Sequence, residues 1–81
     1  MLKIATTTKL SPEEAIKRAA AFFGPAGYKL NIFDQTSLSV CLEGGGGTIE
    51  VVACKDNGKT SVEFLSREWD NVVKEFIKTI R

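Results

Sequence analysis

The sequence predicts an α+β fold in which two helices pack on one face of a five-stranded antiparallel sheet. Two segments carry apolar residues at the helical spacing of 3.6, and five segments before and between them alternate apolar and polar residues. Turn signals separate all of these segments, and no linker or internal repeat interrupts them. The 81 residues therefore form one domain, 1–81, with the element order β-α-β-β-β-β-α.

The first helix is predicted to begin in the stretch 11–14, which reads Ser-Pro-Glu-Glu. Ser11 is a good N-cap, proline suits the first helical position, and a glutamate three residues after the cap completes a capping box. Glu14 and Arg18 are spaced to pair on the solvent side. Gly24 and Pro25 end the helix, and its apolar stripe comprises Ile16, Ala19, Ala20 and Phe23.

The second helix is predicted over residues 69–80, behind a Ser66 cap. Acidic residues in its first turn and basic residues in its last turn agree with the helix dipole. Its apolar stripe comprises Trp69, Val72, Val73, Phe76, Ile77 and Ile80.

Five segments alternate with a period of two, which is typical of half-buried strands. Their inward residues are predicted to be Leu2 and Ile4; Tyr28, Leu30 and Ile32; Leu38, Val40 and Leu42; Ile49, Val51 and Ala53; and Val62 and Phe64. The sequence does not place the first of these strands in the sheet.

Turn residues predict the strand registers. A four-residue loop at 44–47 sets Glu43 opposite Thr48, and a type I′ turn at Asn57-Gly58 sets Ala53 opposite Val62. The remaining hairpin needs a three-residue loop at 35–37, which would set Ile32 opposite Val40 and Leu30 opposite Leu42.

The run Gly44, Gly45, Gly46 and Gly47 raises the question of a phosphate-binding loop. Such loops lead into a helix N-terminus, whereas here Thr48-Ile49-Glu50-Val51 follows, which has the pattern of a strand. The run is therefore interpreted as a flexible loop that turns the chain. Four consecutive glycines exceed what a turn requires, so a mobile tip or the close approach of a partner stays open.

Composition excludes several functions. A net charge of +1 disfavours nucleic acid and anionic lipid as partners. Two cysteines and no histidine remove most metal sites and the commonest general base, so neither a metal nor a cofactor is expected. The sequence lacks a signal peptide and an apolar run long enough to cross a membrane, which predicts a cytoplasmic protein with reduced cysteines.

The sheet face away from the helices is the predicted site of function. Phe33, Cys41, Val52 and Leu65 make that face more apolar than a solvated face requires, which predicts a homodimer or a separate protein partner. Cys41 lies beside Glu50 in the predicted register. A carboxylate keeps a thiol protonated and no base accompanies it, so we expect no enzymatic activity.

An alternative function is the binding of a small apolar ligand between the C-terminal helix and the sheet. Tyr28, Phe64, Trp69 and Phe76 are the candidate lining residues. The competing interpretation is that a chain of this size needs its large side chains to fill the core.

The order β-α-β4-α resembles one repeat of the TATA-binding protein fold and a shortened helix-grip domain of the START and Bet v1 kind. The segment SREWDNVVKEFIKTI is similar in style to the last helix of helix-grip proteins. The first resemblance implies DNA binding on the exposed sheet face, and the second implies an apolar ligand between helix and sheet. The chain departs from both, because it is short for a helix-grip cavity and carries Glu43, Glu50 and Glu63 where a DNA-binding face needs basic residues.

Overall fold

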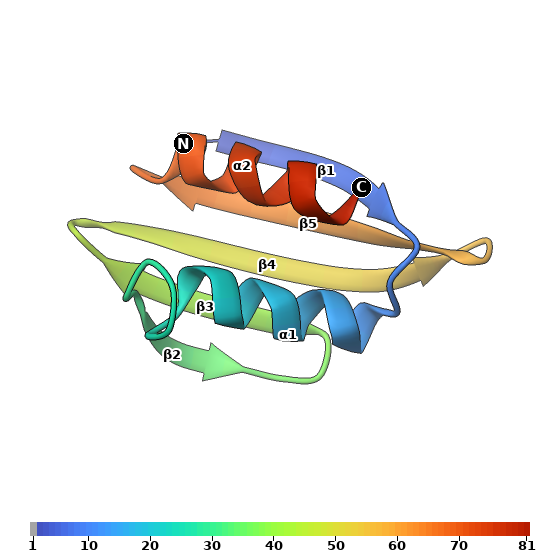
Figure 1. The fold of residues 1–81 in the computed structure, drawn as a ribbon, viewed down its shortest axis with the longest axis horizontal. Helices are drawn as coiled ribbons and strands as arrows, with labels where there is room; N and C mark the ends of the chain where they lie inside the picture. Colours follow the sequence, from blue (N-terminus) through green and yellow to red (C-terminus); the bar gives the residue numbers. More distant parts are fainter. Residues whose placement is uncertain (1) are drawn as a thin grey trace.

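The computed structural model describes residues 2–81 and confirms the predicted α+β architecture (Figure 1). The elements are β1 (Leu2–Thr8), α1 (Pro12–Phe23), β2 (Asn31–Gln35), β3 (Ser39–Gly44), β4 (Gly47–Asp56), β5 (Lys59–Arg67) and α2 (Asp70–Ile80). The strands form one antiparallel sheet in the order β1-β5-β4-β3-β2, which places β1 at the edge beside β5. Both helices lie on the same face of the sheet, α1 over β3 and β4 and α2 over β5 and β1.

The hydrophobic core lies between the helices and the sheet. Phe23, Phe64 and Phe76 are each no more than 1% exposed. Their rings pack together, with centroids 5.1 Å apart for Phe23 and Phe76 and 5.9 Å for Phe64 and Phe76. Since α1, β5 and α2 each supply one of these rings, the cluster joins both helices to the sheet.

The predicted start of α1 is confirmed. The hydroxyl of Ser11 accepts a hydrogen bond of 3.2 Å from the backbone N–H of Glu14, and Pro12 occupies the first turn. The side chain of Glu14 pairs with Arg18 at 3.7 Å across one turn. The helix ends where the N–H of Gly24 donates to the carbonyl of Ala20.

Two of the three predicted hairpin registers are confirmed. Glu43 lies opposite Thr48 and Ala53 lies opposite Val62. The glycine turn is tighter than predicted, because Gly44 pairs with Gly47 and only Gly45 and Gly46 form the turn.

The predicted register of the β2–β3 hairpin is wrong by two residues. Ile32 lies opposite Leu42 rather than Val40. The hairpin loop is longer than predicted, because Gln35 pairs with Val40, and a bulge after Ile32 offsets one residue of the difference. In the segment after α1, Lys29 adopts a φ of 67° and donates its N–H to the carbonyl of Gly24. This segment folds back on the helix end, so the strand begins at Asn31. Leu38, predicted to face the core, lies outside the strands and is 43% exposed.

The predicted cap of α2 is also wrong. Ser66 lies within β5, is 1% exposed, and its hydroxyl has no hydrogen-bond partner in the described structure. Trp69 occupies the N-cap position and makes no side-chain cap. β5 extends past Ser66 because it stays paired with β4 as far as Arg67.

Candidate protein-interaction surface

The sheet face turned away from the helices, called here the outer face, is built from strand residues that alternate with the buried ones. The strand registers arrange its side chains in rows that cross the sheet. The first row contains Arg67, Thr48, Glu43 and Asn31; the second Lys3, Leu65, Glu50, Cys41 and Asp34; the third Ala5, Glu63, Val52 and Ser39.

Apolar side chains lie across the middle of the outer face. Phe33 is 58% exposed and Val52 is 41% exposed, while Cys41 and Leu65 are half-buried. The predicted register, with Ile32 opposite Val40, would set Phe33 opposite Ser39, but a bulge interrupts β2 after Ile32 and places Phe33 outside the regular pairing, next to Asp34. The bulge therefore accounts for the exposure of the Phe33 side chain, the most exposed aromatic side chain of this face.

Apart from Glu50 on the central strand β4 and Glu63 on β5, the charges in the three rows of the outer face are divided between its two sides. Lys3 and Arg67 lie on the side of β1 and β5, and Asp34 and Glu43 lie on the side of β2 and β3. Among residues 2–81 the structure records one ion pair, Glu14 with Arg18, so these four charges are unpaired within the chain. The sequence does not predict this division, because it leaves β1 unplaced and because the predicted register, with Leu30 opposite Leu42, sets Lys29 opposite Glu43, where the structure has Asn31.

Cys41 and Glu50 are neighbours, as the predicted register requires. The Cys41 thiol donates to a carboxylate oxygen of Glu50 at 3.6 Å. Burial raises the pKa of Cys41, and the charge of Glu50, its hydrogen bond and the charge of Asp34 raise it further. The thiol therefore stays protonated at neutral pH, which makes it a poor nucleophile.

This environment predicts slow alkylation of Cys41. In single-thiol variants at pH 8, we expect the thiol of Cys41 (Cys54→Ser) to react several-fold more slowly than the exposed thiol of Cys54 (Cys41→Ser). Adding Glu50→Gln removes the carboxylate charge and should speed the reaction of Cys41. Rates that are equal in the two single-thiol proteins and insensitive to Glu50→Gln would contradict the assigned environment.

The four candidate ligand-lining residues are divided between the core and the surface. Phe64 and Phe76 are core rings, each 1% exposed. Tyr28 is 42% exposed and its hydroxyl donates to a carboxylate oxygen of Glu75 at 3.0 Å, a contact that raises the pKa of Tyr28. The indole N–H of Trp69 donates to the carbonyl of Gly44 at 2.9 Å. Tyr28 and Trp69 meet edge to face at the end of the domain.

The glycine run is explained by close packing as well as by the turn. Gly45 and Gly46 adopt φ values of 57° and 82°, a backbone conformation that residues other than glycine rarely adopt. A Cβ on Gly45 would lie 3.0 Å from the Trp69 ring, and one on Gly44 would lie 2.6 Å from the Leu30 side chain. The run leads into β4, so the helix N-terminus of a phosphate-binding loop is missing from this place.

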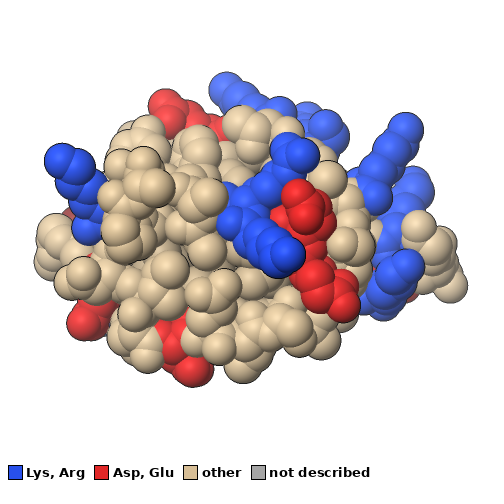
Figure 2. Space-filling model, turned by 60° about the horizontal axis from the view of Figure 1, so that its bottom comes forward, with Lys and Arg blue, Asp and Glu red and all other residues tan. Residues whose placement is uncertain are grey.

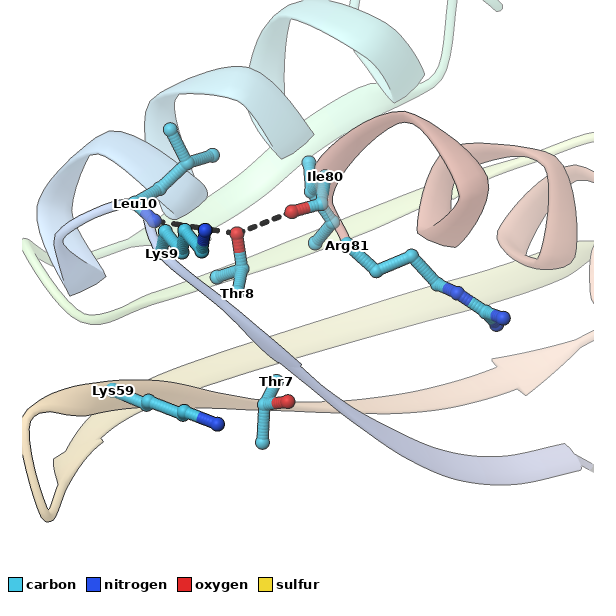
Figure 3. Close-up of a pocket in the computed structure, with 7 residues that line it drawn as sticks. All are labelled: Thr7, Thr8, Lys9, Leu10, Lys59, Ile80 and Arg81. Atoms are coloured by element: carbon cyan, nitrogen blue, oxygen red, sulfur yellow. Dashed lines mark hydrogen bonds between the residues drawn. The ribbon is translucent and has the colours of Figure 1, made fainter.

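Basic side chains gather at one end of the molecule, on the right in Figure 2. A depression of about 440 Å³ lies between β1 and the end of α2 and is lined by Thr7, Thr8, Lys9, Leu10, Lys59, Ile80 and Arg81. The Thr8 hydroxyl donates to the carbonyl of Ile80 and accepts from the N–H of Leu10. Figure 3 shows Arg81 extending away from Lys9, so the cations do not converge on one point. The depression is therefore the groove between β1 and the end of α2, which the hydrogen bond from Thr8 to Ile80 holds together.

Comparison with models of protein families, with curated proteins and with solved structures finds no match to this chain. Within residues 2–81, no three histidine, cysteine, aspartate or glutamate side chains lie close enough to hold a metal ion. Neither of the described helices is long and apolar enough to cross a membrane. The function is therefore argued from the geometry of the outer face.

Proposed function

We propose that this protein is a small non-enzymatic interaction module that binds a second protein molecule, in the first place another copy of itself, through the outer face. The observation that carries the proposal is the exposure of Phe33 and Val52, 58% and 41%, on a sheet face that neither helix covers. An uncovered apolar patch on a folded domain marks an interaction site, and aromatic residues are enriched in such sites.

The chemistry of the face supports binding over catalysis. The thiol of Cys41 has a raised pKa and its neighbours are the carboxylates Glu50 and Asp34, which cannot activate it. The same carboxylates, with Glu43 and Glu63, oppose the phosphate backbone that the TATA-binding resemblance would bring to this face. A cytoplasmic location fits two free thiols, Cys41 and Cys54.

The packing of the core disfavours the small-ligand alternative. A ligand between α2 and the sheet would have to displace Phe64 or Phe76, which contact each other and are each 1% exposed. Burial of both rings already supplies part of the stability of a small domain.

Sedimentation equilibrium over a wide concentration range tests the proposal. We expect a monomer–dimer equilibrium, and we expect Val52→Glu to weaken it more than tenfold because each subunit would bury a new carboxylate in the interface. The strand position of Val52 is 41% exposed, so the thermal midpoint should change little.

Ala21→Glu is the matched control, because it adds the same charge at an exposed position of α1 on the opposite side of the sheet. This variant should dimerise like the natural protein. If the natural protein is a monomer at all concentrations, self-association is no longer part of the proposed function. If both variants weaken the dimer equally, the outer face is not the interface.

A further inference from the structure

We infer that two copies pair face to face about a two-fold axis that runs parallel to β4 and over it. The inference rests on the proposed function and adds the arrangement of the partner. A symmetric dimer uses the same patch on both copies, so the patch must be complementary to itself. The division of charge across the outer face supplies this complementarity.

An axis along β4 exchanges the two sides of the sheet. Because β4 is the central strand in the order β1-β5-β4-β3-β2, β5 of one copy then faces β3 of the other, and β1 faces β2. In the first row, Arg67 lies opposite Glu43 of the second copy. In the second row, Lys3 lies opposite Asp34. Each pairing occurs twice, and Val52 meets its own counterpart near the axis.

An axis perpendicular to the strands would not pair these charges. It would set each strand against its own copy with the rows reversed. An axis between the second and third rows would set Lys3 against Ala5. An axis over the second row would pair Arg67 with Glu63 but set Lys3 against Lys3 of the second copy. Opposite charges steer association and fix the orientation of partners, so the axis along β4 is favoured.

The exposed ring of Phe33 gains a place in this arrangement. A depression of about 160 Å³ on the β1 and β5 side is lined by Lys3, Glu50, Val52, Glu63, Phe64 and Leu65. The axis carries β2 of the second copy over β1, which brings its Phe33 to the β1 side of the depression, beside Lys3.

The area of the outer face predicts a weak dimer. Five strands about 4.8 Å apart, over three rows and the spacing between them, give roughly 500 Å² from each copy. The total of about 1,000 Å² lies at the lower limit of specific interfaces. Glu50 meets its own counterpart near the axis and weakens the dimer further, so we expect dissociation constants in the micromolar range or above.

Charge exchange between Arg67 and Glu43 tests the axis. Arg67→Glu and Glu43→Arg should each weaken self-association about tenfold, because each sets like charges against each other twice. An equimolar mixture of the two variants should associate about as tightly as the natural protein, because both contacts in the mixed dimer join opposite charges. Sedimentation velocity with one variant fluorescently labelled measures the mixed dimer.

The outcomes separate the inference from the function on which it rests. A natural protein that dimerises while the mixture is no tighter than the single variants overturns the axis and leaves the proposed function standing. A natural protein that stays monomeric overturns both. Restoration in the mixture supports the axis, since Arg67 and Glu43 lie on β5 and β3 with β4 between them and do not pair within one chain.

Cross-linking gives a second measurement that does not depend on charge. Cys54 lies on β4 and close to its counterpart, whereas Cys41 lies on β3 and faces β5 of the second copy. At pH values where both thiols alkylate at comparable rates, a short bismaleimide should therefore link dimers of Cys41→Ser through Cys54 faster than dimers of Cys54→Ser through Cys41. The reverse order, measured at pH values where both thiols alkylate at comparable rates, would contradict the axis.

Discussion

Phe76→Ala is expected to destabilise the domain by about 3 to 5 kcal/mol, the range measured for large aromatic residues removed from protein cores. Phe76 is 1% exposed, and its ring centroid lies within 6 Å of those of Phe22, Phe23 and Phe64. Its removal would leave a cavity where α1, α2 and β5 meet. A loss of this size is a large part of the 5 to 15 kcal/mol, roughly, that stabilises most folded domains. Urea unfolding followed by circular dichroism measures it.

Phe33→Ala is the matched control, because it deletes the same atoms at a position that is 58% exposed. In the monomer it should change the free energy of unfolding by no more than about 0.5 kcal/mol. Similar losses for the two variants would mean that Phe33 packs into the fold of the monomer. That result would also remove it from the proposed interface.

Gly47→Ala is expected to lower the free energy of unfolding by about 3 kcal/mol or more, because the added methyl group would overlap backbone atoms of β5 that are fixed in the sheet. A Cβ at this position would lie 2.1 Å from the carbonyl oxygen of Arg67 and 2.7 Å from Cβ of Glu68. Relief would require β4 to move away from the end of β5, where Trp69 bonds the carbonyl of Gly44. Thermal and urea unfolding measure the loss.

Gly46→Ala provides the comparison within the same turn. Its Cβ would meet nothing within 4 Å, and only its φ of 82° opposes a side chain. The expected cost is about 1 to 2 kcal/mol. A smaller loss for Gly47→Ala than for Gly46→Ala would show that backbone strain, rather than close packing, explains the glycine run.

The sequence alone was sufficient for the elements whose determinants are local. Helix α1 begins at Ser11 and ends at Gly24 because capping and termination involve neighbouring residues. The hairpins at Gly45-Gly46 and Asn57-Gly58 have the predicted register because turn residues and alternation both specify it. The first of these hairpins also predicts Cys41 beside Glu50, where the structure has it.

Elements that depend on distant contacts were predicted less well. Ser66 has the chemistry of a helix cap, but pairing of β5 with β4 continues past it and leaves it in the sheet. The β2–β3 register was wrong because the loop between the strands is longer than predicted, with Gln35 paired to Val40, and a bulge follows Ile32.

The candidate site shows the same division. Alternation along each strand was enough to select Phe33, Cys41, Val52 and Leu65 as outward residues, because successive side chains of a strand point to opposite faces. The separation of Lys3 and Arg67 from Asp34 and Glu43 depends on the order of strands across the sheet. That order arises from pairing between segments as far apart as β1 and β5, so only the tertiary structure decides which charges lie on which side.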